Sequence, residues 1–313
     1  MSTQNFFNEK GNAAEQLIAM LCKDAFFEDF CFKNPYRAKG KELCDVLVVL
    51  GEIAIIWQIK NIKLKTGQFS ESDVEKATKQ CRGAKRQLLK LGMITFKNLA
   101  GIDKVIDTTK INEVFLIAAI EGGTPDFSRH YDDEVKGNGN VHIFLEKLTR
   151  FATKHLNTVS DFIEYLRYKE KFFNAHRSVI ISGGEENLLA LYLRNNRSFG
   201  NIDSVENADT IFLDIEEVAD ELEKNDVDYA EKLLADEFSS GWDFLIKKKR
   251  EGLLSDGSKA NGPEHDKFLQ KMMSHNRFER RILAQDFFDA ACKAAEYPYN
   301  ERQVYRRLCP HDD

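Results

Sequence analysis

Two short apolar runs near the start of the chain predict a buried β-hairpin. Residues 46–50 and 53–57 consist almost entirely of Val, Ile, Leu, Ala and Trp, the composition of strands that are covered on both faces. Only two residues separate the runs, and a glycine in the first of them, Gly51, is typical of a tight type II′ turn. Such a turn pairs Leu50 with Ile53 and sets the register of the hairpin. The pattern therefore predicts antiparallel strands inside a layered α/β domain.

Three polar side chains meet at the open end of this hairpin. The register places Asp45 opposite Gln58, and Lys60 lies two residues further along, so all three point to one face. A carboxylate and an amide oxygen suit Mg²⁺, and a neighbouring lysine stabilises negative charge that develops on water or phosphate. These residue types indicate metal-assisted hydrolysis of a phosphodiester. The alternative is that the strand ends simply reach solvent, where charged side chains are ordinary.

Apolar positions at helical spacing predict a long helix over residues 70–91. The stripe that would pack on the sheet consists of Val74, Ala77, Cys81, Ala84 and Leu88. A second stripe is basic and consists of Lys79, Arg82, Arg86 and Lys90. Two interpretations stay open. The basic stripe contacts the phosphates of a nucleic acid, or it is a solvated face whose charge order suits the helix dipole.

The order of these elements resembles the PD-(D/E)XK nuclease superfamily, which has the restriction-endonuclease-like fold. The resemblance rests on a helix that carries Glu15, a strand that opens with Asp45, and the Gln-x-Lys motif of Gln58 and Lys60. It is greatest to the Mrr-type branch, in which glutamine replaces the usual glutamate. It covers roughly residues 8–121, including the long helix and the strand that follows it. The resemblance implies a central mixed sheet flanked by helices.

The resemblance also implies roles for the residues of the hairpin. Asp45 would bind the metal directly, Gln58 would complete or orient its ligands, and the backbone carbonyl of Ile59 would be a further ligand. Lys60 would position and polarise the attacking water or the scissile phosphate. The implied cofactor is Mg²⁺, for which Mn²⁺ can substitute.

Two helices are expected to approach the same site. Glu15 would face it as a ligand, as a residue that orients a ligand, or as a base, although a solvated carboxylate in a first helical turn is the alternative. In related nucleases a polar residue of the long helix approaches the site, and Gln80 takes that place here. Glu42 lies three residues before Asp45, which puts it on the opposite strand face and outside the predicted site.

Charge and cysteine usage narrow the class of protein. The 313 residues carry a net charge of −6, but the first 100 hold 16 Lys and Arg against 11 Asp and Glu, and the rest hold 29 against 40. Nucleic-acid contact is therefore expected from the N-terminal part. Core thiols are expected of the cysteines in apolar segments, which are Cys22, Cys31, Cys44, Cys81 and Cys292. With no signal peptide and no apolar run of the ~20 residues that span a bilayer, we expect a cytoplasmic protein without membrane association.

The pattern changes after about residue 122. Residues 141–145 predict a last strand, and helical patterns follow at 158–173 (opened by Ser160), 184–194 and 277–291, with solvated acidic helices over 214–237. The sequence therefore predicts an α/β (α+β) nuclease domain over residues 1–150. A mainly helical accessory domain, for recognition, partner binding or oligomerisation, would occupy residues 151–313.

The combined expectation is a Mg²⁺-dependent endodeoxyribonuclease that acts in restriction or anti-phage defence. It would cleave duplex DNA as a homodimer, because cutting both strands requires two sites, and could bind a partner protein through its helical half. Three alternatives stay open. The chain is a catalytically inactive nuclease fold that serves as a scaffold or sensor, it cleaves RNA, or its helical half carries the function.

Overall fold

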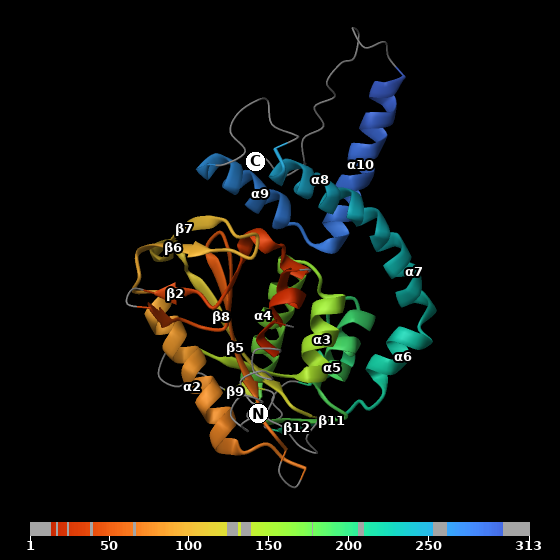
Figure 1. The fold of residues 1–313 in the computed structure, drawn as a ribbon. Coiled ribbons are helices and arrows are strands. Elements are labelled where there is room, and N and C mark those ends of the chain that lie inside the picture. Colours follow the sequence, from red (N-terminus) through yellow and green to blue (C-terminus); the bar gives the residue numbers. More distant parts are fainter. Residues whose placement is uncertain are drawn as a thin grey trace, which may run out of the picture. The chain divides into compact units, whose positions relative to one another are not determined.

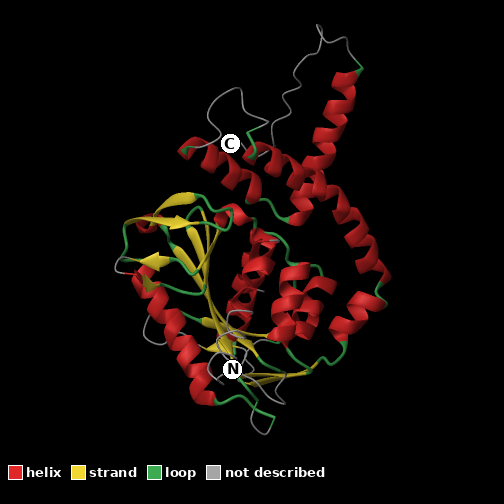
Figure 2. Cartoon of the chain, in the orientation of Figure 1, coloured by secondary structure: helices red, strands yellow, loops and turns green. Residues whose placement is uncertain are grey.

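The structure is a computed structural model that divides into two compact units, Met1–Leu222 and Glu223–Asp313. The first unit is mixed α/β and the second is helical (Figures 1 and 2). The described residues are 14–16, 18–23, 25–37, 40–64, 67–123, 131–132, 139–176, 178–205, 210–252 and 262–296. The predicted fold class is confirmed at this level. The division, however, lies at residue 222 and not at 150, because residues 151–222 belong to the first unit.

A six-stranded mixed sheet forms the centre of the first unit. Its strands, in spatial order, are β1 (Cys31–Lys33), β4 (Val46–Leu50), β5 (Ile53–Asn61), β8 (Glu113–Glu121), β10 (Val141–Leu145) and β9 (Tyr131–Asp132). β4 pairs antiparallel with β1 and β5, and β8 lies parallel to both β5 and β10. The predicted hairpin register is confirmed, since Leu50 lies opposite Ile53 and Val46 opposite Trp57. Gly51 has a φ of +61°, as the tight turn requires.

Helices cover both faces of this sheet (Figure 1). On one face, α2 (Glu71–Leu88) buries the predicted stripe residues Ala77, Cys81, Ala84 and Leu88 against apolar side chains of β5 and β8. On the other face, α4 (Val159–Ala175) places Phe162 against Trp57 and Phe144, with ring centroids 5.8 and 6.0 Å apart. Because water is excluded on both sides, β4 and β5 need no polar alternation.

The remaining elements of the first unit lie around this core. They are η1 (Glu28–Phe30), β2 (Tyr36–Arg37), β3 (Lys41–Glu42), β6 (Met93–Lys97), β7 (Asp103–Asp107), η3 (Thr108–Lys110), α3 (Glu146–His155), β11 (Ser178–Ser182), α5 (Glu185–Arg194), η4 (Gly200–Ser204), β12 (Thr210–Asp214) and α6 (Val218–Lys224), whose last two residues cross into the second unit. Three strand pairs here, β2–β3, β6–β7 and β11–β12, were not predicted from the sequence.

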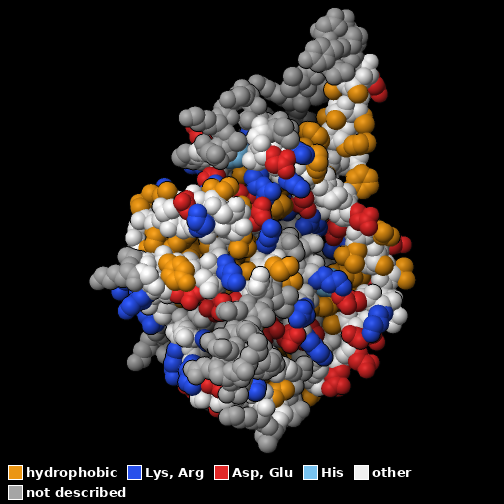
Figure 3. Space-filling model, viewed as in Figure 1, with side chains coloured by type: hydrophobic (Ala, Val, Ile, Leu, Met, Phe, Trp, Pro, Cys, Tyr) orange, Lys and Arg blue, Asp and Glu red, His pale blue; other side chains and the backbone are white. Residues whose placement is uncertain are grey.

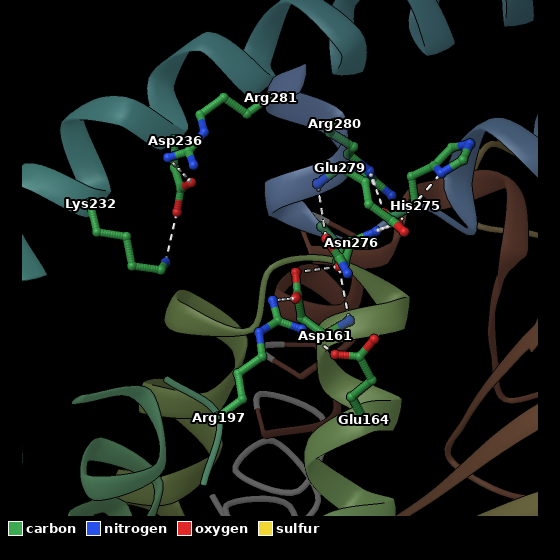
Figure 4. Close-up of polar contacts among 11 residues, drawn as sticks. Asp161, Glu164, Arg197, Lys232, Asp236, His275, Asn276, Glu279, Arg280 and Arg281 are labelled. Carbon is green, nitrogen blue, oxygen red and sulfur yellow. Dashed lines mark hydrogen bonds and ion pairs between the residues drawn. The ribbon is translucent and has the colours of Figure 1, made fainter. Parts of the chain in front are cut away.

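Polar contacts at the start of α4 correct one predicted cap. The cap is Thr158 and not Ser160, because the Thr158 Oγ1 accepts the backbone N–H of Asp161 at 3.0 Å. The Asp161 carboxylate also pairs with Arg197, which in turn pairs with Glu164 (Figure 4). This arginine therefore ties the turn after α5 to the first two turns of α4.

Four helices and a short 3₁₀ turn make up the described part of the second unit from residue 227 onwards. They are α7 (Val227–Asp236), η5 (Glu237–Ser239), α8 (Ser240–Arg250), α9 (Pro263–Met273) and α10 (Arg277–Ala295). Arg280 is 1% exposed and donates to Asp243 Oδ1 and to the Met273 carbonyl, both at 2.8 Å. Asn276 and Glu279 form a capping box at the start of α10 (Figure 4). The arginines at the start of α10 thus serve the unit's own packing.

The surface of the second unit differs from the prediction in one respect. Cys292 is exposed, whereas Cys22, Cys31, Cys44 and Cys81 are buried thiols as expected. Figure 3 shows hydrophobic side chains along α10, and two of its phenylalanines, at positions 287 and 288, are exposed by 51% and 59%. Among the described residues, no helix combines the length and apolar character needed to cross a bilayer.

Gly122 closes the end of β8 against the end of β5. Its φ is +122°, and a Cβ at this position would lie 2.1 Å from the Ile62 carbonyl oxygen. We expect Gly122→Ala to lower the free energy of unfolding by about 3 kcal/mol, because the backbone itself must move. Urea denaturation measures this loss.

Gly92→Ala is the matched control for this substitution. Gly92 also has a positive φ, +67°, but a Cβ there would meet nothing within 4 Å. Only backbone strain remains, so the expected loss is about 1 kcal/mol. An equal loss of unfolding free energy in the two variants would show that the close approach to Ile62 does not contribute to the effect.

Candidate active site at the open end of the hairpin

Asp45 lies one residue before β4, at the open end of the hairpin. Its backbone N–H donates to the Trp57 carbonyl at 3.2 Å. Asp45 is only 7% exposed. Its Oδ2 accepts a hydrogen bond from Gln58 Nε2 at 2.6 Å and another from the Ile59 N–H at 2.5 Å. The predicted opposition of Asp45 and Gln58 is therefore a direct contact. Since the N–H and C=O of one strand residue point to the same edge, the Ile59 carbonyl lies on the Asp45 side as well.

Opposing charges act on this carboxylate. Burial raises the pKa of Asp45 to about 6, the Ile59 N–H and the Lys60 ammonium oppose the rise, and Glu15 and Glu42 add to it. Burial and Glu15 also raise the pKa of Glu42, while Lys60 and Lys33 lower it. Glu42 therefore interacts with a neighbouring carboxylate and with two ammonium groups.

The strand-face argument that placed Glu42 outside the predicted site does not hold in the structure. Counting strand faces backwards from Asp45 assumed one continuous strand. In the structure Glu42 belongs to the separate short strand β3, and a break at residues 43–45 precedes β4. Alternation of side chains holds only within a strand, so sequence spacing could not place this carboxylate.

Asn34 is a site residue that the sequence did not single out. It follows β1, and its backbone N–H donates to the Asp45 carbonyl at 2.8 Å. Its Nδ2 donates to Glu15 Oε2 at 3.4 Å, which brings the helical residues 14–16 to the hairpin. An Asn-Pro dipeptide marks a turn, and that was the available signal.

The oxygen atoms of the site fit a hard divalent cation. In the described ranges, no three His, Cys, Asp or Glu side chains are grouped as a metal site. Mg²⁺, however, is usually held by one or two carboxylates, with water and substrate completing its shell. Asp45 and Glu15 are two such carboxylates, and Gln58 adds an amide. Asn34 Oδ1 is buried and receives no hydrogen bond from the described part of the chain, as a ligand oxygen facing a cation would.

A depression of about 580 Å³ lies beside Lys60. It is lined by the end of β5 and the first half of α2, through Lys60, Asn61, Ile62, Lys63, Asp73, Lys76, Lys79 and Gln80. Four lysines against one aspartate make this surface basic. A basic hollow of this kind suits a polyanionic ligand.

The predicted nucleic-acid-binding residues of α2 separate into two groups. Lys79 and Gln80 line the depression. Arg82 does not, because it is buried and its Nε donates to the Gly139 carbonyl at 3.0 Å. Arg86 is exposed but is not among the residues that line the hollow. The basic stripe therefore does not form one continuous surface.

Helical geometry explains which residues of α2 the prediction missed. Each residue turns the helix by about 100°, so Asp73, Lys76 and Gln80 share one face, and that face borders the depression. Lys63, just after β5, completes the basic surface. The sequence did show these lysines, but spacing alone did not say which face of α2 lies beside Lys60.

Replacing Asp45 tests the electrostatics of the site without any cofactor. A carboxyl group with a raised pKa in the fold destabilises the fold as the pH rises from about 4 to about 6. Asp45→Asn removes this ionisation, so above pH 6 and in EDTA we expect it to be more stable than the wild type by about 1–2 kcal/mol. Urea denaturation from pH 4 to pH 8 measures the difference.

Asp107→Asn should show the opposite trend. Hydrogen bonds from Thr109 lower the pKa of Asp107, so its ionised form favours the fold. The variant should lose stability relative to the wild type as the pH rises through the range in which Asp107 ionises. If Asp45→Asn also lost stability as the pH rises, burial would not be the main influence on the pKa of Asp45.

No family model matches the chain, and no similar protein is found among curated proteins or solved structures. The fold and the geometry of the site are therefore the observations from which a function can be argued. They place a buried, hydrogen-bonded carboxylate, further oxygen atoms and a lysine beside a basic hollow. That arrangement is suited to hydrolysis of a phosphodiester.

Proposed function

We propose that this chain is a metal-dependent nuclease whose active site lies at the open end of the β4–β5 hairpin. The observation that carries the proposal is the buried Asp45 carboxylate, bonded to Gln58 and Ile59, with Lys60 close by at the edge of the basic depression. The order of helix, β1, β4, β5, α2 and β8 agrees with the PD-(D/E)XK resemblance and supports it. A restriction-endonuclease-like fold is part of the proposal.

The residues of the site have distinct tasks in this proposal. Asp45 and Glu15 would hold Mg²⁺ or Mn²⁺, with Gln58 and the Ile59 carbonyl as further ligands. When bound, the cation supplies Lewis-acid activation of water and of the phosphate. Lys60 donates to a phosphate oxygen as negative charge builds on it.

A proton acceptor is needed for the attacking water. Glu15 and Glu42 are the candidates, because each carboxylate interacts electrostatically with Asp45. Glu42 is also an exposed residue of β3. The raised pKa of Glu42 makes it a better base than an ordinary surface carboxylate. Gln58 meanwhile keeps Asp45 in place through its amide.

We take duplex DNA as the substrate, with restriction or anti-phage defence as the setting. The lysines of the depression would contact successive phosphates of one strand, and cleavage of both strands would require two chains. An RNA substrate and a role as an inactive scaffold are the competing functions. The exposed phenylalanines of α10 favour an additional contact with protein through the second unit.

A cleavage assay tests the activity directly. Supercoiled plasmid, linear duplex and single-stranded RNA are incubated at low salt with Mg²⁺, with Mn²⁺ or with EDTA. We expect the wild type to cut DNA only with metal, and Asp45→Ala and Lys60→Ala to lose at least about a hundredfold in rate. Gel electrophoresis of the products measures the rates.

Lys90→Ala is the control for the change in charge. Lys90 lies beyond the end of α2, is exposed, and does not line the depression, so its rate should equal that of the wild type. Cleavage that survives both site substitutions would contradict the assignment of the site. No cleavage of any substrate with either metal would favour the inactive scaffold. Faster cleavage of RNA than of DNA would favour the RNA-cleaving enzyme.

Binding at different salt concentrations tests the depression separately. In an Asp45→Asn background, Lys76→Ala and Lys79→Ala should each weaken duplex binding and reduce the slope of log K against log salt by about one unit. Fluorescence anisotropy with a labelled duplex in EDTA measures both quantities. Arg86→Ala is the comparison from the predicted stripe, and an equal effect there would show that DNA is not confined to the hollow.

A further inference from the structure

Asn34 has a backbone conformation that needs an explanation. Its φ is +47°, a region that residues other than glycine seldom adopt, and the next residue is Pro35, which disfavours compact conformations in the residue before it. Strain of this kind persists where surrounding contacts hold the residue in place, and it is often found at functional sites. The contacts of Asn34 therefore show what the strained turn achieves.

Those contacts join the backbone of Asp45 to the carboxylate of Glu15, two residues from distant parts of the chain. The Asn34 N–H donates to the Asp45 carbonyl at 2.8 Å, which positions the residue at the start of β4. The Asn34 Nδ2 donates to Glu15 Oε2 at 3.4 Å, which holds the carboxylate of the first helix. One residue thus sets the position of Glu15 relative to Asp45.

The third polar group of Asn34, the side-chain oxygen Oδ1, takes no part in these contacts. Oδ1 is buried, and no donor from the described residues reaches it. An amide oxygen has two lone pairs, and leaving it without a partner in a buried place is unfavourable. The Glu15 carboxylate accepts a hydrogen bond from the same amide at 3.4 Å, so a negatively charged group lies beside this oxygen. A cation would satisfy both conditions.

We propose that Asn34 positions Glu15 against Asp45 and that its Oδ1 is a ligand of the divalent cation. This inference rests on the proposed function and assigns a residue that the Gln-x-Lys motif does not contain. A neutral amide oxygen is a hard ligand of the kind that Mg²⁺ and Mn²⁺ accept. It adds an oxygen without adding a further negative charge beside Glu15, Glu42 and Asp45.

The test measures Mn²⁺ binding by isothermal titration calorimetry on the full chain, without substrate. Asn34→Gly removes the amide but keeps a residue that tolerates positive φ, so the melting temperature in EDTA should not fall. We expect its Mn²⁺ affinity to fall about tenfold. Asn196→Gly is the matched control, since Asn196 has a φ of +51° and is exposed, and its affinity should equal that of the wild type.

Asn34→Asp separates the ligand role from the hydrogen bond to Glu15. An aspartate keeps an oxygen but loses the donor, so affinity equal to or above that of the wild type supports Oδ1 as a ligand. An affinity as low as that of Asn34→Gly would overturn the ligand role.

Two further outcomes separate this inference from the proposed function. If the wild type and Asn34→Gly bind Mn²⁺ equally, the inference is wrong while the metal site stands. If the wild type binds no Mn²⁺ at millimolar concentration, the proposed function and the ligand role both fail.

Discussion

The hydrogen bonds to the Asp45 carboxylate are the interaction on which the rest of the site depends. A buried carboxylate is unfavourable unless donors reach it, and here both donors come from β5, through the Ile59 N–H and the Gln58 amide. They meet Asp45 only in one hairpin register. A slip of one residue would turn Gln58 and Lys60 to the opposite face, where Trp57 packs against Phe162. The tight turn at Gly51 therefore controls the chemistry at the other end of the strands.

The second layer of helices follows from the same strands. Both faces of β4 and β5 are apolar, so each requires cover. α2 covers one face, and α4 supplies aromatic side chains to the other. A domain that ended at residue 150 would lack α4 and leave Trp57 without Phe162. The helical patterns beyond residue 150 predict a separate domain, but residues 151–222 belong to the first unit.

Local regularities of the sequence predicted the parts of the site that lie on regular elements. Alternation along a strand and the length of a turn were enough to place Asp45, Gln58 and Lys60 together. Asn34 and Glu42 come from turns and short strands, and tertiary contacts decide where such residues lie. Arg82 shows the same limit on a helix, because its partner is the carbonyl of Gly139, 57 residues away in the chain. Helical spacing identifies a face but not what covers it.

The buried ionisable groups on the two faces of the sheet differ in their partners. On the face of α4, the buried Lys169 lies 2.6 Å from the buried Glu185, so opposite charges balance in this enclosed pair. His142 lies 3.1 Å from Glu170. Burial lowers the pKa of His142 to about 4, which leaves it neutral and inert near neutral pH. Asp45 has carboxylates as neighbours and a basic hollow beside it. These are the two features behind our proposal that a cation binds at the carboxylates and that the basic hollow receives a polyanion.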